Sequence, residues 1–305
     1  MKPDLSVIVV NYNTADFIKA CLESIEGQAG VVHETVVVDN ASRDGSSELI
    51  RSQFPWVSLI SNERNEGFAR ANNQALPCCS GRYIHYLNPD TVVRENAFAR
   101  MVDYMDANDR VGLAGCRLVN PDGSAQSSVE RRYPGQKYAS NELEGLWGDI
   151  AWVMGAAMVA RADLLKLLGG FDERFFIYGE DADLCLRVRK KGWYIGFVND
   201  AVIVHRGGGS EIDNEPVEVW SRKFSAEMLF YRTHYSDRAV RSIRRAHIAK
   251  AFWRVLSIRL SLPFIRDKSA ALGKLARYLH VLDVLRAGDL RLREVNDGEG
   301  HGAGK

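Results

Sequence analysis

Strand-like and helix-like segments alternate in strict order over residues 5–90. Short β-branched runs predict buried parallel strands, and stretches with apolar residues three or four positions apart predict helices between them. The predicted strands are LSVIVVNYN (5–13), HETVVVDNAS (33–42), WVSLISNE (56–63) and RYIHYLNPD (82–90), with helices over 14–28, 44–54 and 67–76. This order predicts an α/β fold, a three-layer sandwich in which helices cover both faces of a mostly parallel central sheet.

Further elements are expected beyond residue 90. The patterns predict a helix over 96–108, a strand entering a turn over 111–123, a strand and then a helix over 151–170, an amphipathic helix within 174–193 and two short strands within 194–210. Residues 124–150 are irregular and polar. Because loops of this length are often functional, we expect this one to form a lid over a binding site.

Each of the four strands predicted within 5–90 ends on polar side chains. The ends read Asn11-Tyr12-Asn13, Asp39-Asn40, Asn62-Glu63-Arg64-Asn65 and Asn88-Pro89-Asp90. The carboxyl ends of parallel strands meet at one edge of a sheet, where ligands bind in folds of this kind. Loops are polar in most proteins, and Pro and Asp are ordinary turn residues. Four such ends together nevertheless predict a polar binding site.

Composition narrows the class of protein. With 305 residues, of which 46% are hydrophobic and 26% charged, the chain is typical of a globular protein with one large domain and an appendage. A net charge of +1 gives no indication of nucleic-acid binding. The five cysteines form no paired CxxC units, which argues against structural zinc. Their odd number, the lack of an export signal and the lack of a run of about 18 apolar residues predict a cytoplasmic location.

The character of the sequence changes near residue 235. Between Ser236 and Lys268, nine Lys or Arg residues are set against two Asp residues and alternate with aromatic and aliphatic side chains. We expect a first domain over 1–235, a basic amphipathic helical extension over 236–295 and a disordered tail over 296–305. The extension, above all 236–268, suits peripheral contact with the anionic inner face of a plasma membrane. Packing on the first domain or in a homodimer is the alternative.

Motifs through the first 210 residues resemble one enzyme family. SVIVVNYN, VVVDNAS, NEGFARANNQA and LNPDT are followed by WVMGAAMVARAD, GGFDERFFIYGEDADLCLRVRKKGW and VIVHRGGGS. In this order the chain resembles the inverting family 2 glycosyltransferases of the GT-A fold, and within them the bacterial rhamnosyltransferase-like members. The resemblance implies transfer of a hexosyl unit from a dTDP- or UDP-sugar, with dTDP-L-rhamnose the best match. The implied acceptor is a saccharide or lipid-linked saccharide in the synthesis of O-antigen or another cell-surface polysaccharide.

The resemblance also implies a divalent cation, Mg²⁺ or Mn²⁺, at the donor diphosphate. Family members carry Asp-x-Asp at the end of the fourth strand, and the matching residues here are Asn88, Pro89 and Asp90. Asp90 is the expected metal ligand, whereas Asn88 replaces the first acid and would contact the nucleotide or offer a neutral oxygen. His205, at the end of VIVH, is the expected second ligand, although a histidine there is often only a polar strand end. The glycines after it suggest a segment that closes over the donor.

The GEDAD sequence supplies the implied general base. By resemblance, Asp181 takes the proton of the acceptor hydroxyl and Glu180 binds the acceptor. Acidic residues at a helix start also serve as caps. Asp183 is expected to have that structural role and to pair with Arg187, four residues later. The remaining expected acceptor contacts are Trp152, Gly155, Phe176 and Tyr178, although most aromatic residues serve only as core.

The nucleotide is expected over the ends of the first two strands. Tyr12 would stack on the base and Asp39 would accept from its imide N–H, with Asn11 and Asn40 as neighbouring polar contacts. The alternative is that Asp39 and Asn40 only cap the following turn. Arg70, on the third predicted helix, would reach the base or a phosphate.

Two other enzyme classes and one non-enzyme are the alternatives. Sugar nucleotidyltransferases and nicotinamide enzymes share the α/β plan but need a glycine-rich phosphate loop after the first strand. This chain has NYNTADF there instead. A non-catalytic binding or scaffold protein on a degenerate transferase fold would account for Asn88, whereas the intact GEDAD favours an enzyme.

Overall fold

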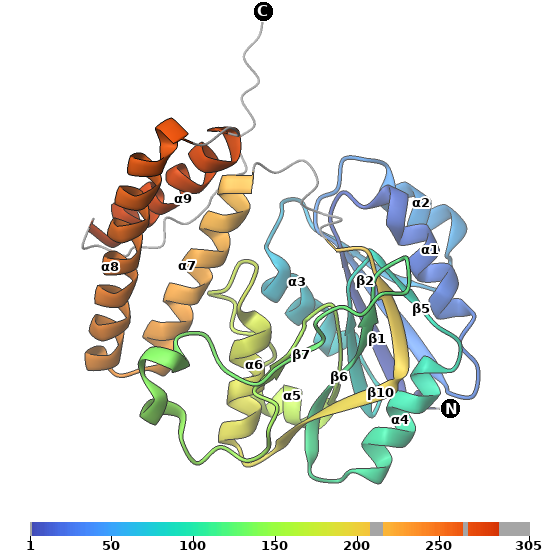
Figure 1. Cartoon of the computed structure of the whole chain (residues 1–305). Helices are drawn as coiled ribbons and strands as arrows, with labels where there is room; N and C mark the ends of the chain where they lie inside the picture. The colour runs from blue at the N-terminus through green and yellow to red at the C-terminus, as the bar shows by residue number, and fades with distance from the viewer. Residues whose placement is uncertain (1, 208–215, 265–267, 287–305) are drawn as a thin grey trace, which may run out of the picture. The chain divides into compact units, whose positions relative to one another are not determined.

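The computed structural model describes residues 2–207, 216–264 and 268–286 (Figure 1). The chain divides into two compact units, one formed by residues 1–133 with 145–212 and the other by 134–144 with 213–305. The tail expected over 296–305 and the glycine segment after Gly207 lie outside the described residues.

The first unit contains an eight-stranded sheet in the order β3-β2-β1-β4-β9-β6-β10-β5. Its strands are β1 (Leu5–Asn11), β2 (His33–Asp39), β3 (Ser58–Ser61), β4 (Tyr83–Leu87), β5 (Thr91–Val93), β6 (Val111–Val119), β9 (Ala157–Arg161) and β10 (Tyr194–His205). β9 is antiparallel to both of its neighbours and β5 is antiparallel to β10, while the other four pairs are parallel. A separate two-stranded ribbon pairs β7 (Val129–Glu130) with β8 (Trp152–Val153). The predicted α/β fold is confirmed, with a mixed sheet.

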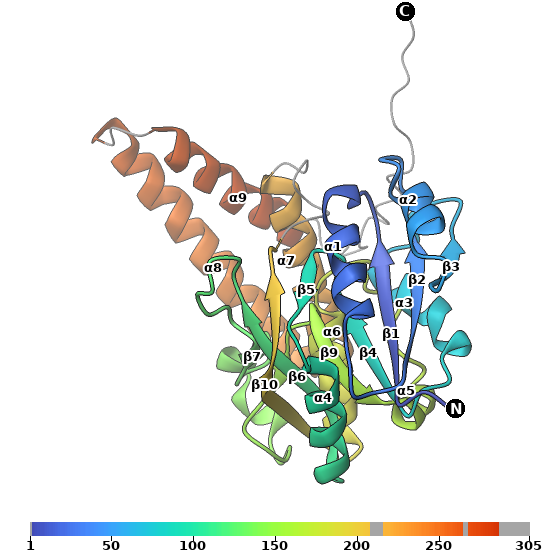
Figure 2. The ribbon, with the colours of Figure 1, turned by 90° about the vertical axis from the view of Figure 1, so that its right-hand side faces the viewer.

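Helices cover both faces of this sheet (Figure 2). One core cluster joins the sheet to α1 (Ala15–Glu26), α2 (Ser46–Gln53) and α4 (Ala97–Ala107), and the other joins it to α3 (Phe68–Ala75), α5 (Ala162–Leu168) and α6 (Glu180–Lys190). The alternation of side chains along a strand explains the two clusters: Val7 and Val9 belong to the first, and Ile8 and Val10 to the second. Both faces are therefore apolar, as the continuous β-branched runs predicted.

The strand register brings the polar strand ends to one edge of the sheet. Asn11 pairs with Asp39, and Asp39 pairs with Ser61, at the carboxyl ends of three parallel strands. β4 runs parallel to β1, so Asn88 and Asp90 follow at the same edge. Two successive antiparallel steps through β9 return β6 and β10 to this direction, so His205 also ends there. The predicted polar edge is confirmed.

Two details differ from the expected elements. The two short strands expected within 194–210 form one strand, β10, with a shift of register between Val198 and Val202. Thr14 occupies the N-cap of α1, but its hydroxyl donates to Asn11 Oδ1 instead of capping the helix. The end of α5 matches expectation, because Gly169 takes the left-handed conformation, with φ of 74°, that ends many helices. Short 3₁₀ turns complete the elements: Leu76–Cys78, Gln136–Tyr138, Ser140–Leu143 and Leu262–Phe264.

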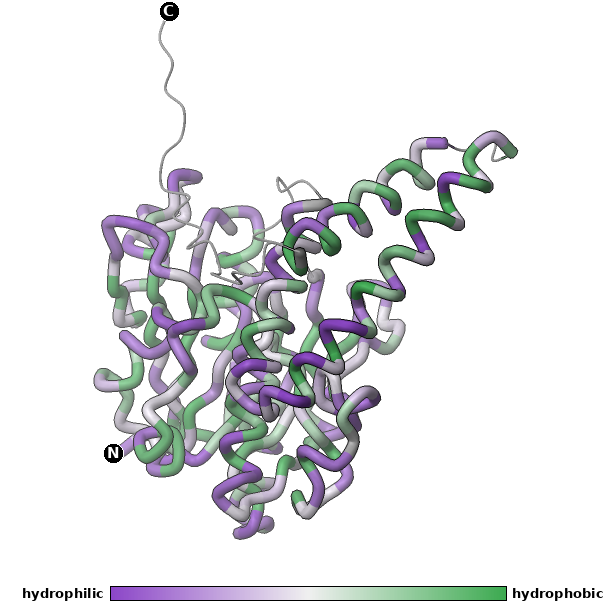
Figure 3. The backbone as a smooth tube through the Cα atoms, turned by 90° about the vertical axis from the view of Figure 1, so that its left-hand side faces the viewer, coloured by the Kyte–Doolittle hydropathy of each residue, from purple (hydrophilic) through white to green (hydrophobic). Residues whose placement is uncertain are grey.

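The second unit is helical. It consists of α7 (Pro216–His234), α8 (Asp237–Ser261) and α9 (Lys268–Arg286), together with residues 134–144. In this unit the ring of His247 contacts the ring of Phe224 edge to face and the ring of Tyr231 at a tilt. Figure 3 shows hydrophobic and hydrophilic residues in alternation along α8 and α9. Of the helices the structure describes, none is both long enough and apolar enough to span a bilayer.

Candidate active site

An acidic turn leads into α6. Tyr178 and Gly179 adopt consecutive left-handed conformations, with φ of 70° and 80°. An aromatic residue seldom adopts this conformation, and such strain tends to gather at functional sites. The turn reverses the chain so that Glu180 and Asp181 begin the helix.

Backbone N–H groups on both sides hold the carboxylate of Asp181. Its Oδ2 accepts from the Gly155 N–H at 3.1 Å and its Oδ1 accepts from the Ala182 N–H at 2.7 Å. Burial raises the pKa of the Asp181 carboxyl from the ordinary 3.8 to about 6, although both hydrogen bonds act in the opposite direction. The result is an oriented carboxylate that is more basic than an ordinary aspartate and is still mostly ionised at neutral pH.

Glu180, one residue earlier, lies in a different environment. It is 6% exposed, and its Oε2 is buried with no hydrogen-bond partner among the described residues. Burial, and then the charge of Asp181, raise the pKa of Glu180 well above its ordinary value. This environment favours the protonated form of the Glu180 carboxyl, which can donate a hydrogen bond as well as accept one.

Asp183 is the structural member of the three acids. Its Oδ2 accepts from Arg187 Nε at 2.7 Å, and Asp183 is fully buried, so the predicted pair is confirmed. Arg187 also donates to the carbonyls of Leu168 and Gly170, at the end of α5. This network ties α6 to α5 and assigns Asp183 to the scaffold of the turn.

Asp90 and His205 face each other at the sheet edge. Antiparallel pairing places His205 opposite Thr91, and His205 Nε2 lies 3.4 Å from Asp90 Oδ1. Both side chains are largely buried. An imidazole nitrogen and a carboxylate oxygen therefore meet although 115 positions separate them in the printed sequence.

Gln126 sets the orientation and the tautomer of the His205 imidazole ring. Its amide nitrogen donates to the His205 carbonyl at 2.8 Å and to Asn120 Oδ1 at 2.7 Å. Its amide oxygen, 2.9 Å from His205 Nδ1, is therefore an acceptor, and Nδ1 carries the proton. Nε2, the nitrogen without the proton, then faces Asp90 and can serve as a metal ligand.

The donor set fits a divalent cation. One carboxylate oxygen and one imidazole nitrogen are suitable ligands for Mn²⁺. Mg²⁺ would bind through the carboxylate, because this ion keeps several of its waters and needs few protein ligands. Asn88 adds an amide whose side chain makes no hydrogen bond to the described residues. No group of three or more His, Cys, Asp and Glu side chains suited to a metal occurs in the described part of the chain. The ion would accordingly depend on the donor phosphates for its remaining ligands.

The dipeptide Gly155-Ala156 connects the turn that carries Asp90 with the carboxylate of Asp181. The Asn88 N–H donates to the carbonyl of Ala156 at 2.9 Å. The preceding residue, Gly155, donates to Asp181. A Cβ on Gly155 would lie 3.4 Å from Asp181 Cβ, so the two residues are in van der Waals range of each other. The turn that carries Asp90 and the carboxylate of Asp181 are thus both bonded to the same dipeptide.

At the other end of the edge, Asn11 and Asp39 are joined. Asn11 Nδ2 donates to Asp39 Oδ1 at 2.7 Å and to Ser46 Oγ at 2.8 Å. Asp39 Oδ2 also accepts from the Ser42 N–H at 3.4 Å, as the turn-capping alternative requires. Tyr12 beside them is half-buried.

Asn40 serves the loop over residues 62–67. Its amide nitrogen donates to Asn65 Oδ1, and its oxygen accepts from Asn62 Nδ2 and the Glu66 N–H. Since these bonds occupy the side chain, Asn40 organises the neighbouring loop and has little capacity left for a ligand.

The same loop packs on the acidic turn. The Phe68 N–H donates to the carbonyl of Phe176 at 2.7 Å. Gly67 has φ of 84°, and a Cβ there would lie 2.8 Å from that carbonyl oxygen, so only glycine fits. Arg70, one turn into α3, forms ion pairs with Glu66 at 3.1 Å and Glu173 at 3.6 Å, and its side chain is half exposed.

The remaining expected contact, Trp152, lies in β8. Its indole N–H donates to the Arg132 carbonyl at 3.1 Å, and its side chain is half-buried. Sequence reasoning missed Gln126, because nothing in the irregular stretch 124–150 distinguishes it from other polar residues. Within that stretch, residues 124–133 and 145–150 belong to the first unit and 134–144 to the second, and the lid stays a prediction.

The sheet order, the helices on both faces and the polar edge with its acidic turn define a transferase of the GT-A class. A family profile described as "Glycosyl transferase family 2" matches residues 6–166, more than half of the chain. The chain therefore belongs to glycosyl transferase family 2 and is a glycosyltransferase.

Individual relatives agree. An uncharacterized glycosyltransferase of Haemophilus influenzae is 31% identical, over 75% of this chain and 74% of that protein. The N-acetylglucosaminyl-diphospho-decaprenol L-rhamnosyltransferase of Mycobacterium tuberculosis is 25% identical, over 66% and 75%. The rhamnosyltransferase WbbL of Escherichia coli is 24% identical, over 65% and 82%.

Solved structures share the fold. A mannosyltransferase of Pyrobaculum calidifontis, in complex with GDP-Man and Mn²⁺, superposes with a TM-score of 0.58 at 19% identity, over 96% of this chain and 89% of that one. TarS of S. aureus, residues 1–349 in complex with UDP, gives a TM-score of 0.52 at 17% identity, over 93% and 92%.

Proposed function

We propose that the chain is an inverting rhamnosyltransferase that moves L-rhamnose from dTDP-L-rhamnose to a lipid-linked saccharide in bacterial cell-surface polysaccharide synthesis. The observation that carries the proposed chemistry is the Asp181 carboxylate, oriented by two N–H donors and bonded to the dipeptide that also pairs with the Asn88–Asp90 turn. The choice of rhamnose rests on the names of the relatives from Mycobacterium tuberculosis and Escherichia coli. The proposed setting is the cytoplasmic face of the plasma membrane, where a lipid-linked acceptor would lie.

In the proposed reaction, Asp181 acts as the general base. Its carboxylate takes the proton of the acceptor hydroxyl while the hydroxyl oxygen forms a bond to the anomeric carbon. The bond from that carbon to the diphosphate oxygen breaks on the opposite face, and its electron pair leaves with the nucleoside diphosphate. A pKa near 6 keeps about nine-tenths of Asp181 ionised at pH 7. Glu180, whose burial favours the protonated form, would donate a hydrogen bond to an acceptor oxygen.

The other residues would bind the donor. Asp90 and His205 would hold Mg²⁺ or Mn²⁺, whose positive charge stabilises the departing diphosphate. The further proposed nucleotide contacts are Asn11, Tyr12, Asp39, Asn40, Arg70 and Asn88, with Asn40 acting through the loop that it holds. Trp152 and Gly155 would line the acceptor side.

Transfer and binding must be measured separately to test this proposal. Calorimetry with dTDP, UDP and GDP, with and without Mg²⁺ or Mn²⁺, should show metal-dependent binding that favours dTDP. Incubation with dTDP-L-rhamnose and a polyprenyl-diphosphate-linked N-acetylglucosamine should yield a rhamnosylated product, and Asp181→Asn should bind dTDP normally yet transfer nothing. Undiminished transfer by Asp181→Asn would refute the proposed base. Failure of every nucleotide to bind would favour the non-catalytic scaffold.

A further inference from the structure

The C-terminal half of α8 exposes a row of large apolar side chains. Trp253, Leu256 and Leu260 are spaced by three and four residues, so they lie on one face of the helix. They are 64%, 41% and 67% exposed. Two more exposed aromatic side chains, 60% and 86% exposed, flank the row: Phe252 and Phe264.

The opposite face of the same helix is buried. Ala251 and Val255, one turn apart, are 1% and 8% exposed, and Ile243 two turns earlier is fully buried. The helix therefore already has an inner face for packing within the second unit. Its outer apolar residues are left over from that packing and need another explanation.

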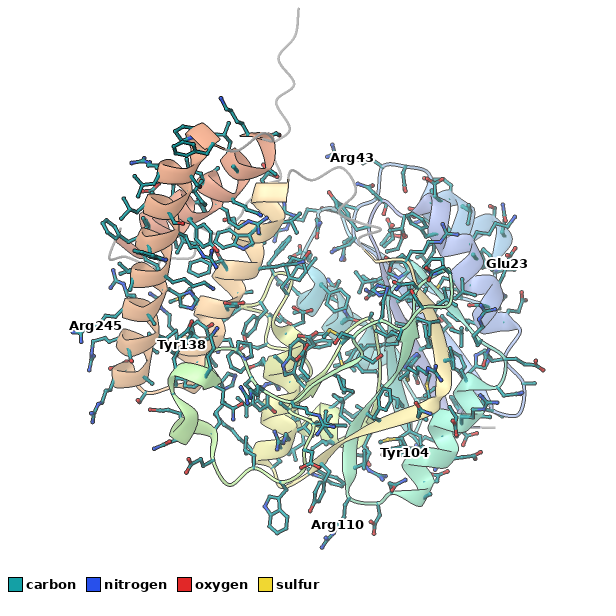
Figure 4. All side chains as sticks on the ribbon, in the orientation of Figure 1. Glu23, Arg43, Tyr104, Arg110, Tyr138 and Arg245 are labelled. Carbon is teal, nitrogen blue, oxygen red and sulfur yellow. The ribbon has the colours of Figure 1, made fainter. Side chains whose placement is uncertain are left out.

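Cations border the apolar row. Arg254 directly follows Trp253, Arg259 directly precedes Leu260, and both arginines are exposed. Figure 4 shows Arg245 extending outward from α8. Within Asp237–Ser261 there are seven Arg or Lys residues and one acid, Asp237 at the start. Long cationic side chains beside apolar ones suit an interface between a polar and an apolar phase, because their charged ends reach water while their stems remain apolar.

We propose that this outer face, formed by Phe252, Trp253, Leu256 and Leu260 with Arg254 and Arg259, docks on the surface of an anionic phospholipid bilayer. The helix would lie in the plane of the interface with its apolar row at the acyl boundary and its cations at the headgroups. A second copy of the chain fits this face less well. A twofold dimer would set the face against itself and oppose the arginines to one another. This proposal concerns binding and does not depend on the donor or on catalysis.

Vesicle co-sedimentation of the full chain tests the proposal. Binding should occur with phosphatidylcholine vesicles that contain phosphatidylglycerol, and should fall with added salt and with neutral vesicles. Leu260→Ala and Trp253→Ala should each weaken binding at least about fivefold. The matched control is Leu167→Ala on α5, where the leucine is 70% exposed against 67% for Leu260. It should bind as the unaltered protein does.

A second pair of variants tests the electrostatic part. Arg254→Gln should weaken binding about fivefold at low salt, and Arg110→Gln, an exposed arginine after α4, should have no effect. The proposal is overturned if the unaltered protein ignores anionic vesicles, or if the Leu260 and Leu167 variants bind alike. It is also overturned if Trp253→Ala abolishes a dimer in analytical ultracentrifugation without changing vesicle binding, or if only a soluble polyanion binds.

Discussion

Asp181→Asn should stabilise the protein while it abolishes transfer. The folded-state pKa of Asp181 is about 6 against an ordinary 3.8, so ionisation of this carboxyl opposes folding. The penalty is absent below about pH 4, where the folded and unfolded states both hold the proton, and it is complete above about pH 6. A shift of roughly two pKa units corresponds to about 3 kcal/mol. Asparagine avoids this penalty but accepts only one of the two backbone hydrogen bonds, which costs about 1 kcal/mol.

The expected net gain is about 2 kcal/mol in the free energy of unfolding above about pH 7. It should turn into a net loss of about 1 kcal/mol near pH 4, where the ionisation penalty is gone and only the lost hydrogen bond remains. Urea unfolding of the variant and the unaltered protein at several pH values measures it. Asp103→Asn, on the exposed side of α4, is the control and should change stability little at any pH. An Asp181→Asn protein that is less stable at neutral pH, or whose advantage does not vary with pH, would refute the assignment of a raised pKa to this carboxyl.

Three more predictions follow from the same site. The pH profile of kcat/KM should show an acid limb near pH 6, with activity about a tenth of its plateau at pH 5, because Asp181 must lose its proton to act as the base. Glu180→Gln should leave the limb in place, since burial is the main cause of the raised pKa of Asp181. A limb near pH 4 would contradict this assignment. Gln126→Met should raise the Mn²⁺ concentration for half-maximal transfer about 10- to 100-fold, and excess metal should restore activity. Ser124→Ala in the neighbouring turn should leave this concentration unchanged. An unchanged metal requirement in Gln126→Met would show that Gln126 does not position His205. Arg187→Met should lower the free energy of unfolding by about 3 kcal/mol in urea titrations, because it removes the cation from buried Asp183. Arg187→Lys should lower it by less. Equal stability of both variants and the unaltered protein would contradict the structural role of the pair.

Sequence reasoning succeeded where the signal is local. Alternating segments defined the layers, and the polar ends of β1, β2 and β4 defined the edge, because parallel strands leave no other place for their carboxyl ends. The Asp183–Arg187 pair follows from helical spacing alone. These inferences need only the period of each element.

Reasoning failed where the determinant is a contact between distant segments. Gln126 and His205 are 79 residues apart and meet only because β10 returns beside β6. No element was predicted over Pro216–His234, yet the structure has α7 there. The four bonds of Asn40 likewise depend on how the loop over 62–67 folds back, which no spacing in the sequence indicates.

The acidic start of α6 shows how local rules and function diverge. The helix N-terminus and two N–H donors both favour an ionised Asp181 and should lower its pKa, as they do for ordinary caps. Burial outweighs them, and the net shift of about two pKa units is upward. Two residues later, Asp183 is more deeply buried but receives the guanidinium of Arg187. The fold thus provides a cation for Asp183, the acid that holds the structure together. Among the residues that the structure describes, no cation is bonded to Asp181, the acid proposed to take the proton, and this suits a general base near neutral pH.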